Sequence, residues 1–242
     1  MSMPQERSVT SIDAPLTSTS CSLPSYPPVP EITPCQKTSG GRIVVLNGFP
    51  GAGKFTILKH AKELLPAKKT CLLDNHLLID PVQAIYPDRS PEHHELRRKL
   101  REPVFQSLSK LAQEGHVVLM TACLADDNDR DAAVFQEHLA MVRGTEVPFF
   151  WVNVHCEQAV LEQRIRNQER CQSEKTKLTD VGVLQKLVRE HRLIQPSESG
   201  GGSARLVVEV LDVSGAVEMS VSRLMDIVGL TQSVEPVKLT PE

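Results

Sequence analysis

From residue 41 onward, short runs of apolar residues alternate with segments in which apolar residues recur at helical spacing. This alternation predicts a parallel sheet wrapped by helices, because parallel strands need long crossover connections that are usually helical. The apolar runs are almost continuous, as is typical of strands covered on both faces. The five predicted strands are 42–47, 69–74, 116–122, 148–154 and 205–212.

Six segments have the apolar spacing of amphipathic helices, five of them between these strands and one after the last. The second is expected to be interrupted at Pro103, and the last is expected to begin at a Ser214 cap. His76 is interpreted as a turn residue, and Asp80 as the cap of a turn before Pro81. The predicted helices are 54–65, 91–113, 130–142, 156–169, 180–194 and 214–229.

Residues 1–40 show neither the apolar runs of strands nor the apolar spacing of helices. They hold seven of the 17 prolines and are rich in Ser and Thr. Such a composition cannot bury enough apolar surface to offset the entropy of the ordered chain. The sequence therefore predicts a disordered tail over 1–40, one folded domain over 41–230 and a short polar tail over 231–242.

Charge and apolar content limit the partners that we expect. The formal net charge is −3, whereas sequence-independent binding of nucleic acid depends on a basic surplus. The longest apolar runs have four to six residues, and a bilayer crossing needs about 18. We therefore expect no nucleic-acid partner and no membrane partner. The six cysteines show no paired spacing, which favours a reducing, cytoplasmic compartment.

The strongest chemical signal is the sequence 48-GFPGAGKFT-56, which follows the first predicted strand and opens the first predicted helix. Glycines in such a turn let backbone N–H groups converge on phosphate oxygens, and the helix N-terminus adds a favourable dipole. Lys54 is expected to contact the β- and γ-phosphates. The predicted nucleotide-binding residues are Gly48, Pro50, Gly51, Ala52, Gly53, Lys54, Phe55 and Thr56.

One position departs from the general pattern G-x-x-x-x-G-K-[ST], in which a hydroxyl directly after the lysine helps to hold magnesium. Here Phe55 follows the lysine, and Thr56 comes one place later. This spacing resembles the loop G-x-P-G-x-G-K-G-T of adenylate kinases and related nucleoside monophosphate kinases. The resemblance implies that Thr56 lies near the nucleotide phosphates, and we predict that Thr56 and Asp74 are the magnesium ligands.

Over residues 41–230 the order of elements also resembles the small-molecule branch of the P-loop kinases. This branch includes gluconate and shikimate kinases, chloramphenicol phosphotransferase and zeta-toxin-like enzymes. The resemblance implies the strand order 2-3-1-4-5, ATP and Mg²⁺ as cofactors, and an acceptor-facing acid at the end of the second strand. That acid is Asp74, which can accept a hydroxyl proton or hold magnesium through water. The alternative, that Asp74 only caps the following turn, stays open.

Phosphoryl transfer needs positive charge around the migrating group. The resemblance implies one arginine on the helix before a lid and another within the lid, and Arg164 and Arg170 match these positions. Candidate acceptor-binding residues are Arg97, Arg101 and Arg130. For the 97–101 cluster, pairing with nearby glutamates on a solvated helix face is the alternative.

Together these observations predict an α/β fold with a doubly wound, five-stranded parallel sheet, and an ATP-dependent phosphotransferase that acts on a hydroxyl of a small molecule. The third strand lacks the terminal acid of a Walker B sequence, which argues against a motor ATPase. No [NT]-K-x-D motif occurs, which disfavours a GTPase. Two alternatives stay open: a nucleoside monophosphate kinase, and a nucleotide-binding module with little turnover. Neither the acceptor nor the oligomeric state is specified by the sequence.

Overall fold

The centre of the domain is a five-stranded sheet in which every pair of neighbouring strands is parallel. The computed structural model describes residues 40–166, 178–196 and 205–231. The strand order is β2-β3-β1-β4-β5, so the predicted fold class and strand order are confirmed. The strands are β1 (Arg42–Asn47), β2 (Thr70–Leu73), β3 (Val117–Ala122), β4 (Phe149–His155) and β5 (Leu206–Asp212).

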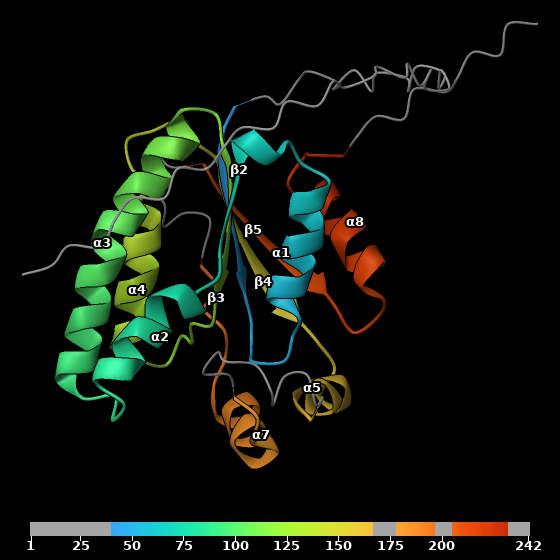
Figure 1. The fold of residues 1–242 in the computed structure, drawn as a ribbon. Helices are drawn as coiled ribbons and strands as arrows, with labels where there is room; N and C mark the ends of the chain where they lie inside the picture. The colour runs from blue at the N-terminus through green and yellow to red at the C-terminus, as the bar shows by residue number, and fades with distance from the viewer. Residues whose placement is uncertain (1–39, 167–177, 197–204, 232–242) are drawn as a thin grey trace, which may run out of the picture. The chain divides into compact units, whose positions relative to one another are not determined.

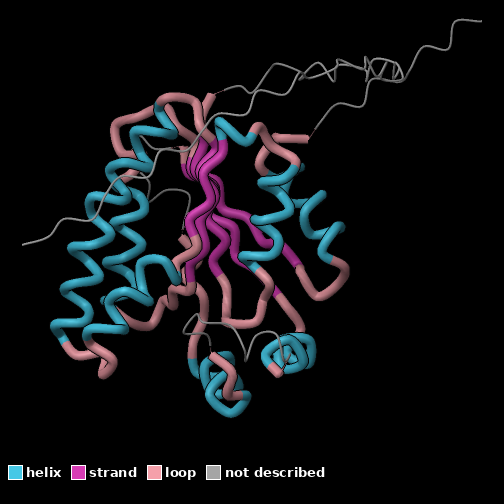
Figure 2. Tube along the Cα trace, viewed as in Figure 1, coloured by secondary structure: helices cyan, strands magenta, loops and turns pink. Residues whose placement is uncertain are grey.

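Helices cover both faces of this sheet (Figure 1). Helices α3 and α4 lie on one face, α1 and α8 lie on the other, and α5 and α7 lie beyond one end of the strands (Figures 1 and 2). Among the residues that the structure describes, no helix is long and apolar enough to span a bilayer. The bounds are α1 (Lys54–Glu63), η1 (Ala67–Lys69), α2 (His76–Ile85), α3 (Pro91–Gln113), α4 (Asp129–Ala140), α5 (Gln158–Ile165), α7 (Val181–Glu190) and α8 (Val217–Ile227).

The central strand β1 separates two apolar layers. Its residues alternate between them: Ile43 and Val45 pack in the layer under α3 and α4, and Val44 and Leu46 pack in the layer under α1 and α8. All four side chains are fully buried. Burial on both faces explains the continuous apolar run in the sequence. It also fixes the point at which the chain leaves β1 and enters the glycine-rich turn.

The predicted interruption at Pro103 is wrong, because α3 runs through it as one helix. A proline inside a helix removes one backbone hydrogen bond, a loss of roughly 3 kcal/mol that packing can offset. Arg101 and Phe105, on either side of the proline, are buried. Ser107 Oγ also donates a hydrogen bond of 2.8 Å to the Pro103 carbonyl. Tertiary contacts therefore hold both flanking turns in place.

The turn predicted before Pro81 is also wrong, because His76, Asp80 and Pro81 all lie in α2. Leu78 and Val82 are buried one helical turn apart, and α2 packs against α3. This i, i+4 spacing was the helical signal in the sequence. The pair Asp80–Pro81 is typical of a turn and favoured that prediction, but Pro81 is accommodated inside the helix.

The start of α8 differs from the prediction as well. Its N-cap is Ala216 rather than Ser214. The Ser214 hydroxyl instead accepts a hydrogen bond of 2.9 Å from the backbone N–H of Glu157. Ser214 therefore ties the segment before α8 to the segment before α5.

Helix α7 ends at Glu190, four residues before the predicted end. The residues that follow pair with the chain beyond β3 instead of continuing the helix. Leu193 forms an antiparallel bridge with Ala125, and the Asp126 N–H donates to the Arg192 carbonyl at 2.9 Å. This pairing anchors the end of α7 to the sheet.

Candidate active site

The phosphate loop, residues 48–56, joins β1 to α1 at the carboxyl edge of the sheet. Gly51 and Gly53 adopt left-handed backbone conformations, with φ of +91° and +79°. A Cβ atom on Gly51 would also lie 3.1 Å from Ile165 Cγ1 and 3.2 Å from the Leu161 carbonyl oxygen. Both the backbone conformation and the neighbouring α5 therefore require glycine at position 51.

Lys54 is held against this loop. Its Nζ donates to the carbonyl of Gly48 at 2.6 Å and to the carbonyl of Phe49 at 3.0 Å. Helix α1 begins at Lys54 behind Gly53, a cap residue that has no side chain to bond the first amide groups of the helix. A helix N-terminus with a cation beside it favours an anion. This is the geometry that a phosphate-binding loop needs, and nucleotide binding by its residues stays a prediction.

The first turn of α1 carries the departure from the general motif. Phe55 and Thr56 are both exposed there. Within the described parts of the chain, no group of three or more His, Cys, Asp or Glu side chains is placed to hold a metal ion. Mg²⁺ is usually held by one or two carboxylates, waters and substrate phosphates rather than by a cage of side chains. The hydroxyl of Thr56 and the carboxylate of Asp74 are oxygen donors of the kind that it prefers.

Asp74 follows β2 and is 4% exposed. Its Oδ1 accepts a hydrogen bond of 3.0 Å from Thr121 Oγ1 on β3, and Thr121 Oγ1 accepts one of 2.9 Å from the Asn75 N–H. The contact that would cap the following turn, from the His76 N–H to Asp74 Oδ1, is longer at 3.5 Å. The neighbouring strand therefore orients this carboxylate more closely than the turn does.

Asp74 and the phosphate loop lie at the same edge with one strand between them, since β3 separates β2 from β1. Neighbouring strands are about 5 Å apart, so the two groups leave the sheet roughly 10 Å apart. Ligands of open α/β sheets bind at this edge.

Arg164, in the last turn of α5, lies beside the phosphate loop. Its Nη1 is 3.7 Å from the position that a Cβ atom on Gly53 would take. Its Nη2 donates to the Val213 carbonyl at 3.0 Å, which fixes the guanidinium in this place. Arg170, the other predicted catalytic arginine, lies outside the described residues.

The structure gives Arg101 a role different from the predicted one. Its guanidinium makes two hydrogen bonds to the Glu137 carboxylate, at 2.6 and 3.0 Å, and its side chain is 6% exposed. This ion pair joins α3 to α4. Because the ion pair occupies the guanidinium, it argues against the predicted role of Arg101 in acceptor binding.

Arg97 and Arg130 differ from Arg101 in this respect. Among the residues that the structure describes, the buried Nε of Arg97 has no hydrogen-bond partner. Burial, together with the charges of Arg101 and Arg89, lowers the pKa of Arg97 to about 10. Arg130 Nη1 lies 3.2 Å from His94 Nε2. Arg89 and His94 also lie near Arg97, and neither belongs to a sequence motif.

Comparisons with known proteins agree with the fold. A family model described as an AAA domain matches residues 44–190. The structure of a candidate kinase from Chloroflexus aurantiacus is 14% identical, with a TM-score of 0.54, and the match covers 78% of this chain and 98% of that one. A sugar kinase from Janibacter sp. HTCC2649 is 14% identical, with a TM-score of 0.51 and coverage of 78% and 95%. A gluconokinase from Sinorhizobium meliloti 1021 is 14% identical, with a TM-score of 0.47 and coverage of 78% and 91%. Among curated proteins there is no match in sequence.

Proposed function

The chain belongs to the AAA domain family, and from this premise we propose that it is an ATP- and Mg²⁺-dependent phosphotransferase that acts on a hydroxyl of a small-molecule acceptor. The observation that carries the proposal is the buried Asp74 carboxylate, oriented by Thr121 at the edge where the phosphate loop lies. A nucleotide-binding module needs the loop, whereas a buried carboxylate at this edge can in addition take the proton of an acceptor hydroxyl. Two solved structures with the same fold are described as kinases, which supports the proposal.

In the proposed reaction the phosphate loop and Lys54 hold the β- and γ-phosphates of ATP. The acceptor oxygen attacks the γ-phosphorus while Asp74 takes the hydroxyl proton. The bond from the γ-phosphorus to its bridging oxygen breaks, and the electron pair leaves with ADP. Lys54 and Arg164 stabilise the negative charge that spreads over the phosphoryl oxygens.

Magnesium, when bound, neutralises charge on the nucleotide phosphates. The residues that would hold it are Asp74 and Thr56. Because Phe55 replaces the usual hydroxyl, we propose that the carboxylate contributes more to this site than the loop does.

The test is transfer of labelled γ-phosphate from ATP by the full chain to a panel of sugars, sugar acids, polyols, nucleosides and nucleoside monophosphates. We expect a labelled phosphate ester, formed at a hydroxyl of the acceptor. Its formation should be lost in Lys54→Ala and kept in Lys59→Ala, a matched change at an exposed lysine of the same helix. Stabilisation of the protein by ATP without transfer or hydrolysis would contradict the proposal and favour a binding module. Transfer to the phosphate of a nucleoside monophosphate would instead identify a nucleotide kinase.

A further inference from the structure

Asn47 is the last residue of β1, the middle strand of the sheet, and stands directly before the phosphate loop. It lies outside the glycine-rich motif, so the sequence alone does not mark it as a site residue. Its side chain is fully buried. A buried amide group destabilises a fold unless it is hydrogen-bonded, and an apolar side chain of the same size avoids that cost. Packing alone therefore does not explain an asparagine at this position.

The Asn47 side chain holds one residue beyond the neighbouring strand β3 by both of its backbone groups. Its Oδ1 accepts a hydrogen bond of 2.8 Å from the Leu124 N–H, and its Nδ2 donates to the Leu124 carbonyl at 3.2 Å. The backbone ladder of the two strands reaches the pair Asn47 and Ala122. The N–H of Gly48 then donates to the Ala122 carbonyl at 3.2 Å. The side chain thus extends the pairing to Leu124, two residues past the end of β3.

The segment 121–124, which Asn47 holds against β1, adjoins both halves of the proposed transfer site. On one side it borders the phosphate loop, in which Lys54 is held. On the other side Thr121 Oγ1 donates to Asp74 Oδ1 at 3.0 Å. Because β3 lies between β1 and β2, the placement of this segment against β1 sets how far Asp74 stands from Lys54.

A second buried amide contacts Asn47 from β4. Asn153 Oδ1 accepts from Asn47 Nδ2 at 3.0 Å, and Asn153 Nδ2 donates to the Ile194 carbonyl at 2.9 Å. Trp151 Nε1 donates to the same carbonyl at 3.0 Å, and the Ile194 N–H donates to the Leu124 carbonyl at 3.1 Å. Asn153 therefore holds the chain that follows α7, whereas Asn47 holds the segment between the two halves of the site.

We infer that Asn47 is a positioning residue for phosphate transfer. By fixing Leu124 against β1, it sets the gap between the γ-phosphate at Lys54 and the acceptor hydroxyl at Asp74. This inference rests on the proposed function. Phosphoryl transfer depends on the placement of the reacting groups, and a displacement of about 1 Å lowers a rate about a hundredfold. ATP binding depends instead on the backbone N–H groups of the loop and on Lys54. Loss of the contacts with Leu124 should therefore slow transfer without weakening ATP binding.

The test is steady-state transfer by the full chain of Asn47→Leu, with Asn153→Leu as the matched control and the acceptor that the panel above identifies. Both changes replace a buried amide by an apolar side chain of similar size, on neighbouring strands. Asn47→Leu is expected to lower kcat about a hundredfold and to leave unchanged both the KM for ATP and the affinity for a non-hydrolysable ATP analogue. Asn153→Leu keeps both bonds between Asn47 and Leu124 and should keep its kcat.

The conservative variant Asn47→Asp tests for rescue. Burial favours the protonated carboxyl, which can accept from the Leu124 N–H and donate to the Leu124 carbonyl, so most of the activity should be retained. If Asn47→Leu does not fold, the smaller Asn47→Val, which suits a strand, is compared with Asn153→Val. Trp151 is the only tryptophan of the chain, and its emission checks the fold around Ile194 in each variant.

A normal kcat in Asn47→Leu, or an equal loss of kcat in Asn47→Leu and Asn153→Leu, would overturn the inference. A higher KM for ATP with an unchanged kcat would also overturn it, since Asn47 would then serve ATP binding. Failure of the proposed function is a separate result, because it is seen in the wild-type chain as the absence of transfer to every acceptor. That absence would contradict the phosphotransferase and the role of Asn47 together, whereas a normal variant beside an active wild type contradicts the role of Asn47 alone.

Discussion

The ion pair between Arg101 and Glu137 offers a test of how the arginines on α3 divide between structure and substrate binding. The change Glu137→Gln keeps the size of the side chain and removes its charge. Arg101, which is 6% exposed, would then be left buried with a neutral partner. If Arg101 is structural, the variant loses stability but binds the acceptor normally.

The expected loss of stability in Glu137→Gln follows from how deeply Arg101 and Glu137 are buried. Removing one partner of a fully buried pair costs about 3–5 kcal/mol. Because the Glu137 side chain is 28% exposed, part of its charge is already screened by water, and we expect about 3 kcal/mol. The comparable change Glu95→Gln breaks the exposed pair with Arg98, which water screens, so we expect little change in stability.

Urea unfolding of the full chain measures both free energies, and acceptor saturation curves measure KM. We expect Glu137→Gln to lower the unfolding free energy by several times more than Glu95→Gln does, with KM for the acceptor unchanged. Replacing both Arg101 and Glu137 by methionine should restore most of the stability. A variant that keeps its stability but binds the acceptor poorly would refute this division of roles.

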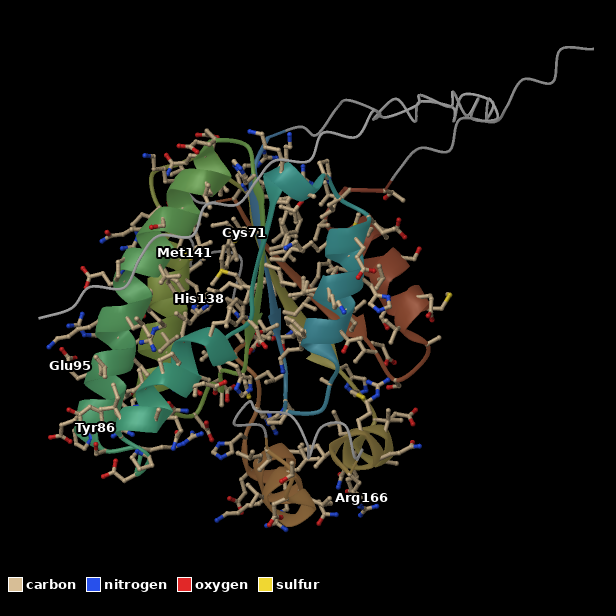
Figure 3. All side chains as sticks on the ribbon, viewed as in Figure 1. Cys71, Tyr86, Glu95, His138, Met141 and Arg166 are labelled. Atoms are coloured by element: carbon tan, nitrogen blue, oxygen red, sulfur yellow. The ribbon has the colours of Figure 1, made fainter. Side chains whose placement is uncertain are left out.

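Two further predictions concern buried polar groups. Burial lowers the pKa of His138 from 6.5 to about 4 (Figure 3). The unfolded chain therefore takes up a proton that the folded chain excludes, and stability falls as the pH drops from about 6.5 to 4, by roughly 3 kcal/mol. His138→Phe should flatten this part of the pH–stability curve, and an unaltered curve would contradict the reasoning. In the second prediction, Thr121→Val removes the hydrogen-bond donor to Asp74 and should lower kcat about tenfold without changing the affinity for ATP. Thr121→Ser keeps the hydroxyl and should retain activity. Equal kcat values in both variants would exclude a positioning role for Thr121.

The phosphate loop and the positions of the strands could be predicted because both are encoded locally, whereas the strand order was predicted from the resemblance to P-loop kinases. Residues 48–56 carry their own geometry, since the glycines, the lysine and the start of α1 follow one another in the chain. Continuous apolar runs such as that of β1 mark strands buried on both faces. Helix α2 could have been predicted in the same way, because Leu78 and Val82 have helical spacing.

The surroundings of the site could not be predicted, because they depend on which residues the fold brings together. Nothing in the sequence links Thr121 to Asp74, 47 residues away, until the register of β2 and β3 is known. Arg97 and Arg101 have the same local sequence character. Only the packing of α3 against α4 gives Arg101 a partner and, among the described residues, leaves the buried Nε of Arg97 without one.

We propose that Asp74 takes the proton of the acceptor hydroxyl during phosphate transfer. The most direct measurement is single-turnover transfer from ATP to the acceptor by Asp74→Asn, with Asp80→Asn in α2 as the control. Asparagine keeps an oxygen that can accept from Thr121 Oγ1, so the fold should be unchanged, and saturating Mg²⁺ and ATP are used because Asp74 is also a proposed ligand of the metal. The account predicts that the rate falls by about 10²- to 10⁴-fold in Asp74→Asn and is normal in Asp80→Asn. A full transfer rate in Asp74→Asn would contradict it.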